Sequence, residues 1–335
     1  MKLWDSLLIL KNIIRCLLFL YSLLIPIYKF VFYKKNYFKY YCSTYHNNIN
    51  PWFIVGFVDA EGCFNINITK SNSNLIGYQV QARFIIELNV KDKYVLYKIQ
   101  QFFQGIGSIT ITKNVARYSI FSLKDINKII TFFNEYPLQG SKYIDFTCWK
   151  ECVYLMLNKQ HLTSQGLKKI LSYKNEMNFG ESKKLKKLFP NIIPIKKPIF
   201  NLFNPELNPY WITGFIEGEG SFHINTNKNT NKMRPVFSIG LNQKDDKLLI
   251  RINKFFKEIG SIYKSNSNNS VELKVYKINN LNYLIEHLNN YPLQGFKSYN
   301  FTLWCDIVKL LENKVLTPEI LYKINDLKNK LNKWK

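Results

Sequence analysis

The chain contains one apolar segment twice, and this duplication constrains its fold more than any other feature. The first copy occupies residues 51–64 (PWFIVGFVDAEGCF) and the second occupies residues 209–222 (PYWITGFIEGEGSF), 158 positions further on. Each copy begins at a proline, which suits the first turn of a helix, and closes on two acidic residues and a glycine, which suits a helix end. The sequence therefore predicts two equivalent helices in a chain built from two related halves.

Small residues recur at a four-residue spacing within each copy. They are Gly56 and Ala60 in the first copy, and Gly214 and Gly218 in the second. Residues four apart share one face of a helix, so this spacing leaves a smooth face on which another backbone can approach closely. Packing the two faces together would bring Glu61 and Glu219 side by side at the helix C-termini. Carboxylates oppose the helix dipole there and repel each other, and a bound divalent cation would offset both costs.

The runs at residues 56–62 (GFVDAEG) and 214–220 (GFIEGEG) resemble the name-giving motif of the LAGLIDADG homing endonucleases. Two copies in one chain resemble the monomeric, pseudo-symmetric branch of that family. The resemblance implies a metal-dependent DNA endonuclease, with Mg²⁺ or Mn²⁺ held by the acid at the penultimate position of each motif, here Glu61 and Glu219. Each half would then cut one DNA strand. Asp59 and Glu217 point elsewhere on a helix and are expected to be structural.

The resemblance also suggests a basic residue near each metal, Lys142 and Lys297, which would stabilise transition-state charge. The alternative is a lysine at a helix N-terminus without a catalytic role. The family often carries a water-positioning polar residue at the end of the second strand of each half. That position holds Gln243 in the second half but Val90 in the first. This departure leaves open whether the two DNA strands are cut equally.

The charge of the chain points to a polyanionic partner. Lys and Arg number 47 against 23 Asp and Glu, a net charge of +24, and nucleic acid is the leading candidate for such an excess. A hydrophobic share of 47% excludes a disordered basic tail. The six cysteines and four histidines show no metal-ligand spacing, which disfavours zinc and a disulfide framework. The expected partner is double-stranded DNA with a long, asymmetric target, bound by a monomer.

The order of the periodic segments predicts an α+β fold. After each motif helix, two alternating segments, a helix, two more alternating segments and further helices follow, which gives two pseudo-symmetric αββαββα repeats. The segment YPLQG at 136–140 returns at 291–295, as expected for duplication of a whole domain. The resemblance implies antiparallel, saddle-like sheets joined at the pair of motif helices. The predicted boundaries are 49–178 for the first repeat and 208–335 for the second.

One face of the predicted sheets is polar. A solvated sheet face is the simpler interpretation, but Asn, Gln and Arg can form bidentate hydrogen bonds with base edges in the major groove, and the net charge favours DNA binding. The candidate DNA-contacting residues are Asn65, Asn67, Gln79, Gln81, Arg83, Thr110, Thr112 and Arg117 in the first half, and His223, Asn225, Asn227, Arg234 and Ser238 in the second.

Two segments lie outside the repeats. Residues 1–48 form an apolar and basic leader of uncertain role, whose uncharged stretch Cys16–Tyr28 is shorter than a membrane span. We do not expect a membrane as a partner, although membrane association stays open as an alternative. Residues 179–207 form a linker rich in lysine and proline, and the prolines predict an extended connector. Its lysines could be solubilising or could grip phosphates.

These features together predict a site-specific double-strand DNA endonuclease that hydrolyses phosphodiester bonds and promotes intron mobility. The alternative is an RNA-binding maturase that assists splicing of a group I intron, in which case intron RNA would be a partner. The chain is rich in Lys, Asn, Ile, Phe and Tyr, whose codons are AT-rich. That bias suggests an organellar genome, with the mitochondrion as the expected location and the plastid as the alternative.

Overall fold

The structure is a computed structural model that describes residues 49–178, 180, 183–196, 198, 206–227, 229, 232–312 and 315–332. The described residues belong to one compact unit that starts at Ile49, so the leader expected over residues 1–48 lies outside them. No helix in these described ranges is long and apolar enough to span a membrane.

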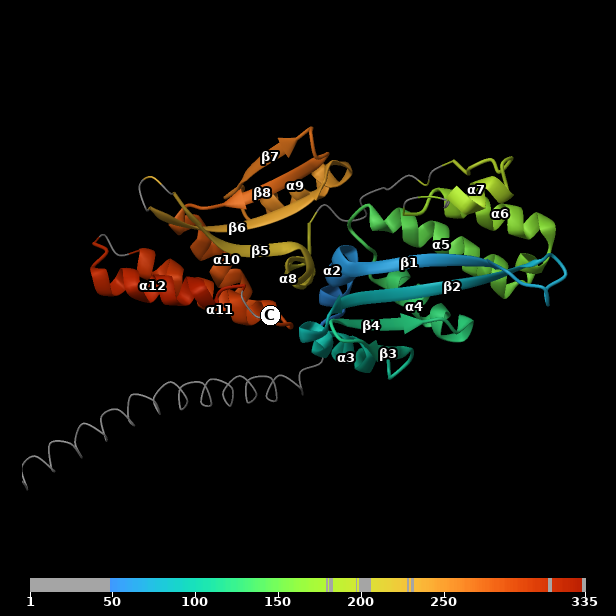
Figure 1. The fold of residues 1–335 in the computed structure, drawn as a ribbon, viewed down its shortest axis with the longest axis horizontal. Helices are drawn as coiled ribbons and strands as arrows, with labels where there is room; N and C mark the ends of the chain where they lie inside the picture. Colours follow the sequence, from blue (N-terminus) through green and yellow to red (C-terminus); the bar gives the residue numbers. More distant parts are fainter. Residues whose placement is uncertain are drawn as a thin grey trace, which may run out of the picture. The chain divides into compact units, whose positions relative to one another are not determined.

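The element order confirms the predicted α+β repeats (Figure 1). The first repeat consists of α2 (Pro51–Glu61), β1 (Gly62–Lys70), β2 (Tyr78–Asn89), the 3-10 helix η2 (Val90–Asp92), α3 (Lys93–Phe102), β3 (Ser108–Ile111), β4 (Val115–Ile120), α4 (Leu123–Glu135), α5 (Lys142–Leu157), η3 (Gln160–Leu162) and α6 (Ser164–Asn175). After α7 (Lys183–Leu188), the second repeat consists of α8 (Pro209–Glu219), β5 (Gly220–Thr226), β6 (Met233–Asn242), η4 (Gln243–Asp245), α9 (Asp246–Phe255), β7 (Ser261–Ser265), β8 (Ser270–Val275), α10 (Ile278–Asn290), α11 (Lys297–Leu311) and α12 (Pro318–Lys330).

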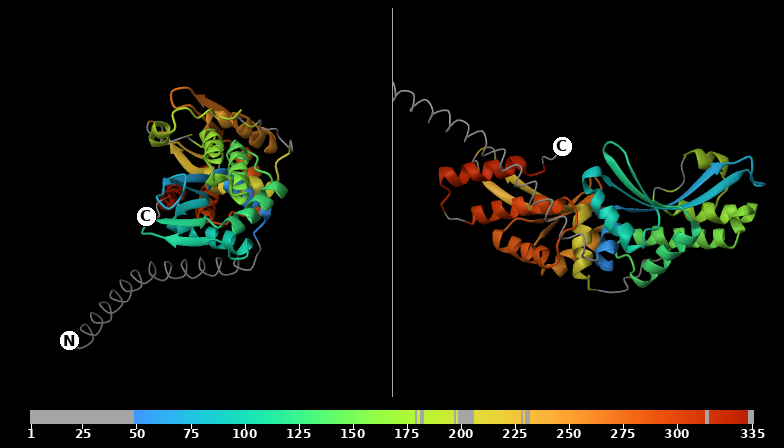
Figure 2. Two further views of the ribbon diagram at one scale, coloured as in Figure 1. Left: turned by 90° about the vertical axis from the view of Figure 1, so that its right-hand side faces the viewer. Right: turned by 90° about the horizontal axis from the view of Figure 1, so that it is seen from below.

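Each repeat contains one antiparallel four-stranded sheet. The strand orders are β1-β2-β4-β3 and β5-β6-β8-β7, so the two sheets have the same topology. The helices of each repeat pack on one side of its sheet (Figure 2). Between the sheet and these helices, Phe64 packs its ring against Trp149 in the first repeat, and Phe222 packs against Trp304 in the second, with centroids 5.2 Å apart in both. The apolar side of each alternating strand therefore forms the core, and the polar side is left uncovered by these helices.

The two motif helices α2 and α8 pack directly on each other, which confirms the expected contact between the halves. The contact is closest at the glycines. A Cβ added to Gly56 would lie 2.9 Å from the backbone nitrogen of Phe215, and one added to Gly214 would lie 2.9 Å from that of Phe57. Real Cβ atoms essentially never approach other atoms that closely, so only glycine permits this approach of the two backbones.

Both motif helices begin as predicted. Asn50 and Asn208 are the N-caps, and their side chains accept a hydrogen bond from the backbone N–H of Trp52 and Tyr210, each at 2.9 Å. Each proline follows at the first helical position, where the missing N–H is not needed.

The glycines after the helices have a different role from the one expected for a helix end. Gly62 and Gly220 have φ near −70°, so they do not form a left-handed cap. The strands β1 and β5 start directly at these glycines. A Cβ there would lie within 3 Å of the backbone oxygen of Val58 or Ile216. The glycines are therefore needed for space at an abrupt helix-to-strand transition.

Part of the predicted extended connector is helical. The run Lys183–Leu188 forms α7, because no helix breaker occurs before Pro190 and Leu185 is buried. The ring of Phe189 packs against Tyr78 with centroids 5.1 Å apart, which holds the segment on the first repeat. Residues 192–196 have no regular secondary structure, in line with Pro194.

Candidate active site at the ends of the motif helices

Glu61 and Glu219 are the last residues of α2 and α8, and both are half-buried. The side chain of Glu61 lies over the partner helix, since a Cβ on Gly218 would be 3.1 Å from its Cγ. Burial raises the pKa of both carboxyl groups, and the charge of Glu61 raises the pKa of Glu219 further, whereas Lys142 and Lys297 lower both. The structure thus brings together the two predicted acids in a place where burial disfavours their negative charge and the two lysines offset only part of that cost.

Lys142 and Lys297 are the first residues of α5 and α11, and their amines reach the ends of the motif helices. The Lys142 amine donates to the carbonyl oxygens of Ala60 (3.1 Å) and Gly62 (2.6 Å). The Lys297 amine donates to those of Ile216 (3.0 Å) and Gly218 (2.8 Å). The carbonyls of Ala60, Ile216 and Gly218 belong to the last turns of the motif helices, where the dipole is negative, so each lysine offsets it. Burial lowers the pKa of both lysines, and nearby carboxylates oppose that shift.

Asp59 and Glu217, two residues before the motif-end acids, bind the segments that precede α5 and α11. Asp59 accepts hydrogen bonds from the backbone N–H groups of Gln139 (2.8 Å) and Gly140 (3.1 Å) and from the indole of Trp211 (2.9 Å). Burial raises the pKa of Asp59 to about 6, against these donors and Lys142, which lower it. Glu217 accepts the equivalent bonds from Gln294 (2.6 Å) and Gly295 (3.0 Å). Both acids are buried, as a structural role requires.

Asp59 and Glu217 thus anchor the two YPLQG segments that lead into α5 and α11. The two segments have the same sequence, and their backbone N–H groups bond to these acids in the same way in both halves. Sequence reasoning noted the repetition of YPLQG but did not connect it to Asp59 and Glu217.

Val90 and Gln243 occupy equivalent places at the starts of η2 and η4. Their backbone N–H groups donate to the carbonyl oxygens of Asn114 and Asn269, both at 3.0 Å. Both side chains are half-buried. The two halves therefore match in backbone and differ in the polarity of this one side chain.

The donor set at the helix ends fits a hard divalent cation. No cluster of three or more His, Cys, Asp or Glu side chains able to hold a metal occurs among the described residues. Mg²⁺ commonly uses one or two carboxylates and completes its shell with waters and substrate phosphates. Glu61 and Glu219 would supply that small set of oxygen ligands, and a nucleic-acid substrate would supply more.

The outward face of the first sheet carries most of the predicted DNA-contacting residues. The register pairs Asn65 with Arg83 and Asn67 with Gln81 on β1 and β2. The Arg83 guanidinium donates to the Gln81 side chain at 2.7 and 2.9 Å and lies over the ring of Phe121. Gln79, Thr110 and Thr112 are exposed further along this face.

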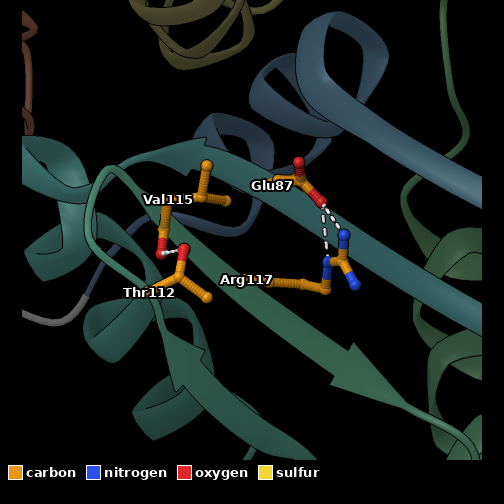
Figure 3. Close-up of polar contacts among 4 residues, drawn as sticks. All are labelled: Glu87, Thr112, Val115 and Arg117. Carbon is orange, nitrogen blue, oxygen red and sulfur yellow. Dashed lines mark hydrogen bonds and ion pairs between the residues drawn. The ribbon is translucent and has the colours of Figure 1, made fainter.

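Like Arg83 and Gln81, Arg117 and Thr112 have partners within the protein (Figure 3). Arg117 forms an ion pair with Glu87 on the neighbouring strand, with Nε–Oε2 at 2.6 Å. Thr112 lies just beyond β3, and its hydroxyl donates to the Val115 carbonyl at 3.2 Å. Glu87 was missed by sequence reasoning, although its alternation with Arg83 along β2 places it on the same face.

The second sheet differs in how accessible its predicted residues are. Asn225 and Arg234 face each other on β5 and β6 and are exposed. His223 is half-buried and its pKa is lowered by burial. Ser238 points to the same side but is only 6% exposed. Asn227 lies just after β5, where its N–H donates to the Lys232 carbonyl at 2.9 Å. Lys274, which the sequence reasoning missed, lies beside Ser238 on β8 and pairs with Glu272 at 2.8 Å.

Comparison with known proteins agrees with this arrangement. The sequence model of the LAGLIDADG endonuclease family matches residues 54–153 and 212–308, one match to each repeat. The chain therefore belongs to the LAGLIDADG endonuclease family.

Similar fungal proteins carry related descriptions. The chain is 37% identical over 286 residues to "Probable intron-encoded endonuclease 3" of Neurospora crassa, which covers 83% of this chain and 54% of that protein. It is also 37% identical to "Probable intron-encoded endonuclease 2" of the same species, covering 84% of this chain and 65% of that protein. The chain thus spans between about half and two thirds of the length of these relatives.

Solved structures of the family superpose closely on the chain. The LAGLIDADG homing endonuclease I-GzeII in complex with its DNA target matches with a TM-score of 0.80 and 32% identity over 86% of this chain and 99% of that one. I-SmaMI bound to an uncleaved DNA target in the presence of calcium ions matches with a TM-score of 0.80 and 32% identity over 85% of this chain and 99% of that one.

Proposed function

We propose that the chain is a monomeric, site-specific double-strand DNA endonuclease, encoded within an intron of a mitochondrial gene, that cuts a long asymmetric target. One observation carries this proposal: two carboxylates meet at the ends of packed motif helices, each beside a lysine, between two sheets with polar outward faces. The similar proteins named above support the intron and the DNA target. A mitochondrial protein of Saccharomyces cerevisiae, 26% identical over 309 residues, supports the location.

In this proposal Glu61 and Glu219 would hold Mg²⁺ or Mn²⁺. When bound, the cation polarises the phosphate and lowers the pKa of an attacking water. Lys142 and Lys297 stabilise the negative charge that develops on the phosphate oxygens, because their amines are held at the same helix ends. The outward residues of β1, β2, β5 and β6 contact the duplex, and Gln243 orients the water at one of the two sites.

The experiment that tests the function is cleavage of a duplex spanning the intron-free insertion site of the gene that encodes this chain. With Mg²⁺ present, we expect a double-strand break at one position and none in a duplex of scrambled sequence. Binding to the intron RNA without any cutting of this duplex would favour the splicing role and contradict the endonuclease.

DNA binding should depend steeply on salt, because lysines and arginines on a phosphate backbone displace condensed counterions. If the protein neutralises about six phosphates, affinity should fall by roughly a thousandfold between 50 and 200 mM salt. Fluorescence anisotropy on the target and on a scrambled duplex of equal length measures the slope for both. A flat dependence on either duplex would contradict an interface dominated by phosphate contacts.

The two DNA strands should be cut at different rates, since Gln243 has no polar counterpart at Val90. Gln243→Val should slow cutting of the faster strand by about tenfold or more, through loss of an oriented water. Val90→Gln should speed cutting of the slower strand. Labelling each strand separately in a single-turnover assay measures both rates. Equal rates in the parent protein, unchanged in either variant, would remove Gln243 from the mechanism.

A further inference from the structure

The helices that carry the two lysines are capped by the opposite repeat. Asp245, at the end of η4 in the second repeat, accepts from the backbone N–H and the hydroxyl of Ser141, both at 3.0 Å. Asp92, at the end of η2 in the first repeat, accepts from the backbone N–H of Phe296 at 2.8 Å. Ser141 and Phe296 are the N-caps of α5 and α11, and neither cap residue supplies a capping bond from its own side chain. The next residue in each helix is the lysine.

A second crossed contact lies beside each cap. The Lys98 amine of the first repeat donates to the Gln294 side chain at 2.8 Å. The Arg251 guanidinium of the second repeat donates to the Gln139 side chain at 3.0 Å and to its carbonyl at 3.2 Å. Asp245 stands 153 positions after Asp92, and Arg251 stands 153 positions after Lys98, so these are the same two positions in each repeat. The crossing is thus reciprocal.

Each lysine is therefore held at two ends, by its own repeat and by the opposite one. At its far end, each lysine amine bonds to carbonyls at the end of the motif helix in its own repeat, Ala60 for Lys142 and Gly218 for Lys297. At its near end, the start of α5 or α11 is fixed by an aspartate of the other repeat. Carboxylate caps at helix N-termini satisfy N–H groups that have no partner inside the helix and also complement the helix dipole. Removing one frees the first turn of the helix, and a misplacement of about 1 Å at a reacting centre can slow a reaction about a hundredfold.

We propose that Asp92 and Asp245 are positioning residues that act across the repeat boundary: Asp92 places Lys297, and Asp245 places Lys142. This inference rests on the proposed endonuclease function. It means that neither repeat has a complete cutting centre of its own, because each lysine depends on an acid from the other half. The crossing also predicts which variants share a phenotype, which a purely structural role does not.

The test compares the ratio of the cutting rates on the two DNA strands, measured in single turnover at saturating protein and well below each variant's melting temperature. Lys142→Met and Lys297→Met should shift this ratio in opposite directions and so assign each lysine to a strand. Asp92→Ala should shift it in the same direction as Lys297→Met, and Asp245→Ala in the same direction as Lys142→Met, each slowing its strand about tenfold to a hundredfold. DNA affinity should stay within twofold of the parent.

Two sets of variants serve as controls. Asp92→Asn and Asp245→Asn keep a hydrogen-bond acceptor and should restore most of the lost rate, since Asn caps a helix about as well as Asp. Asp246→Ala removes a partly exposed acid next to Asp245 that pairs with Lys264 in its own repeat, and it should leave the ratio unchanged.

The possible outcomes distinguish a failure of the positioning role from a failure of the proposed endonuclease function. A parent protein that fails to cut its target rejects the endonuclease function. A parent that cuts, with lysine or aspartate variants that leave the strand ratio unchanged, overturns the positioning role. A match between each aspartate and the lysine of its own repeat overturns it too, as does a failure of the Asn variants to recover.

Discussion

Gly214→Leu is expected to disrupt the packing of α8 on α2 and so to destabilise the protein. The new Cβ would lie 2.9 Å from the backbone nitrogen of Phe57, and the rest of the leucine would have to enter the same space. Overpacking a well-packed interior usually costs about 1–3 kcal/mol. Here the obstacle is backbone, which cannot rotate away, so we expect a loss of about 3 kcal/mol or more. For a chain of 335 residues, with an unfolding entropy of about 2.1 cal/mol/K per residue, that corresponds to a melting temperature lower by about 4 °C or more.

Cleavage should fall together with stability, because Glu219 lies five residues beyond Gly214 on the same helix. The matched control for melting is Gly240→Leu, since a Cβ on Gly240 meets no atom within 4 Å. Thermal denaturation of both variants measures the difference. A Gly214→Leu protein that melts like the parent would show that α2 and α8 do not pack through these glycines.

The second large effect is a separation of cleavage from binding at the paired glutamates. Glu61→Gln combined with Glu219→Gln keeps the shape of both side chains and removes their charge. The motif helices should still pack, because their contact lies at Gly56 and Gly214. Without metal the melting temperature should be at least that of the parent, since burial and the mutual repulsion of the two acids disfavour their charged forms.

DNA affinity should survive in this double variant, because the candidate contacts lie on the outward faces of the sheets. Cutting should fall by at least about a thousandfold, because metal ions supply several kcal/mol of transition-state stabilisation and no carboxylate would remain to hold them. The matched control is Glu87→Gln, an exposed acid of the first sheet whose partner is Arg117. It should change binding more than the chemical step.

The sequence predicted well those features that arise from local patterns. Gly56 and Gly214 fixed the helix pair because the absence of a side chain at that spacing has one simple structural use. The two alternating segments after the first motif helix correspond to β1 and β2, and the polar side of each became the outward face. The repetition of the motif then gave the second half its fold.

Features that depend on contacts distant in sequence could not be predicted in the same way. Asp92 and Asp245 look like ordinary acids at the start of a helix, and nothing local shows that they cap helices of the opposite repeat. Ser238 alternates as an outward residue, yet its neighbours bury it. The helix α7 was missed because the prolines after it outweighed the lysine and leucine run before them.

Single-turnover cutting rates of the parent and of the Glu61→Gln, Glu219→Gln double variant show directly whether these two acids carry the chemistry. Both proteins are mixed in excess with the insertion-site duplex, in Mg²⁺ and at a salt concentration where anisotropy shows full binding. The account predicts equal binding, a double-strand break by the parent, and at least about a thousandfold slower cutting by the variant. Cutting by the variant at near the parent rate would contradict the account and place the catalytic carboxylates elsewhere in the chain.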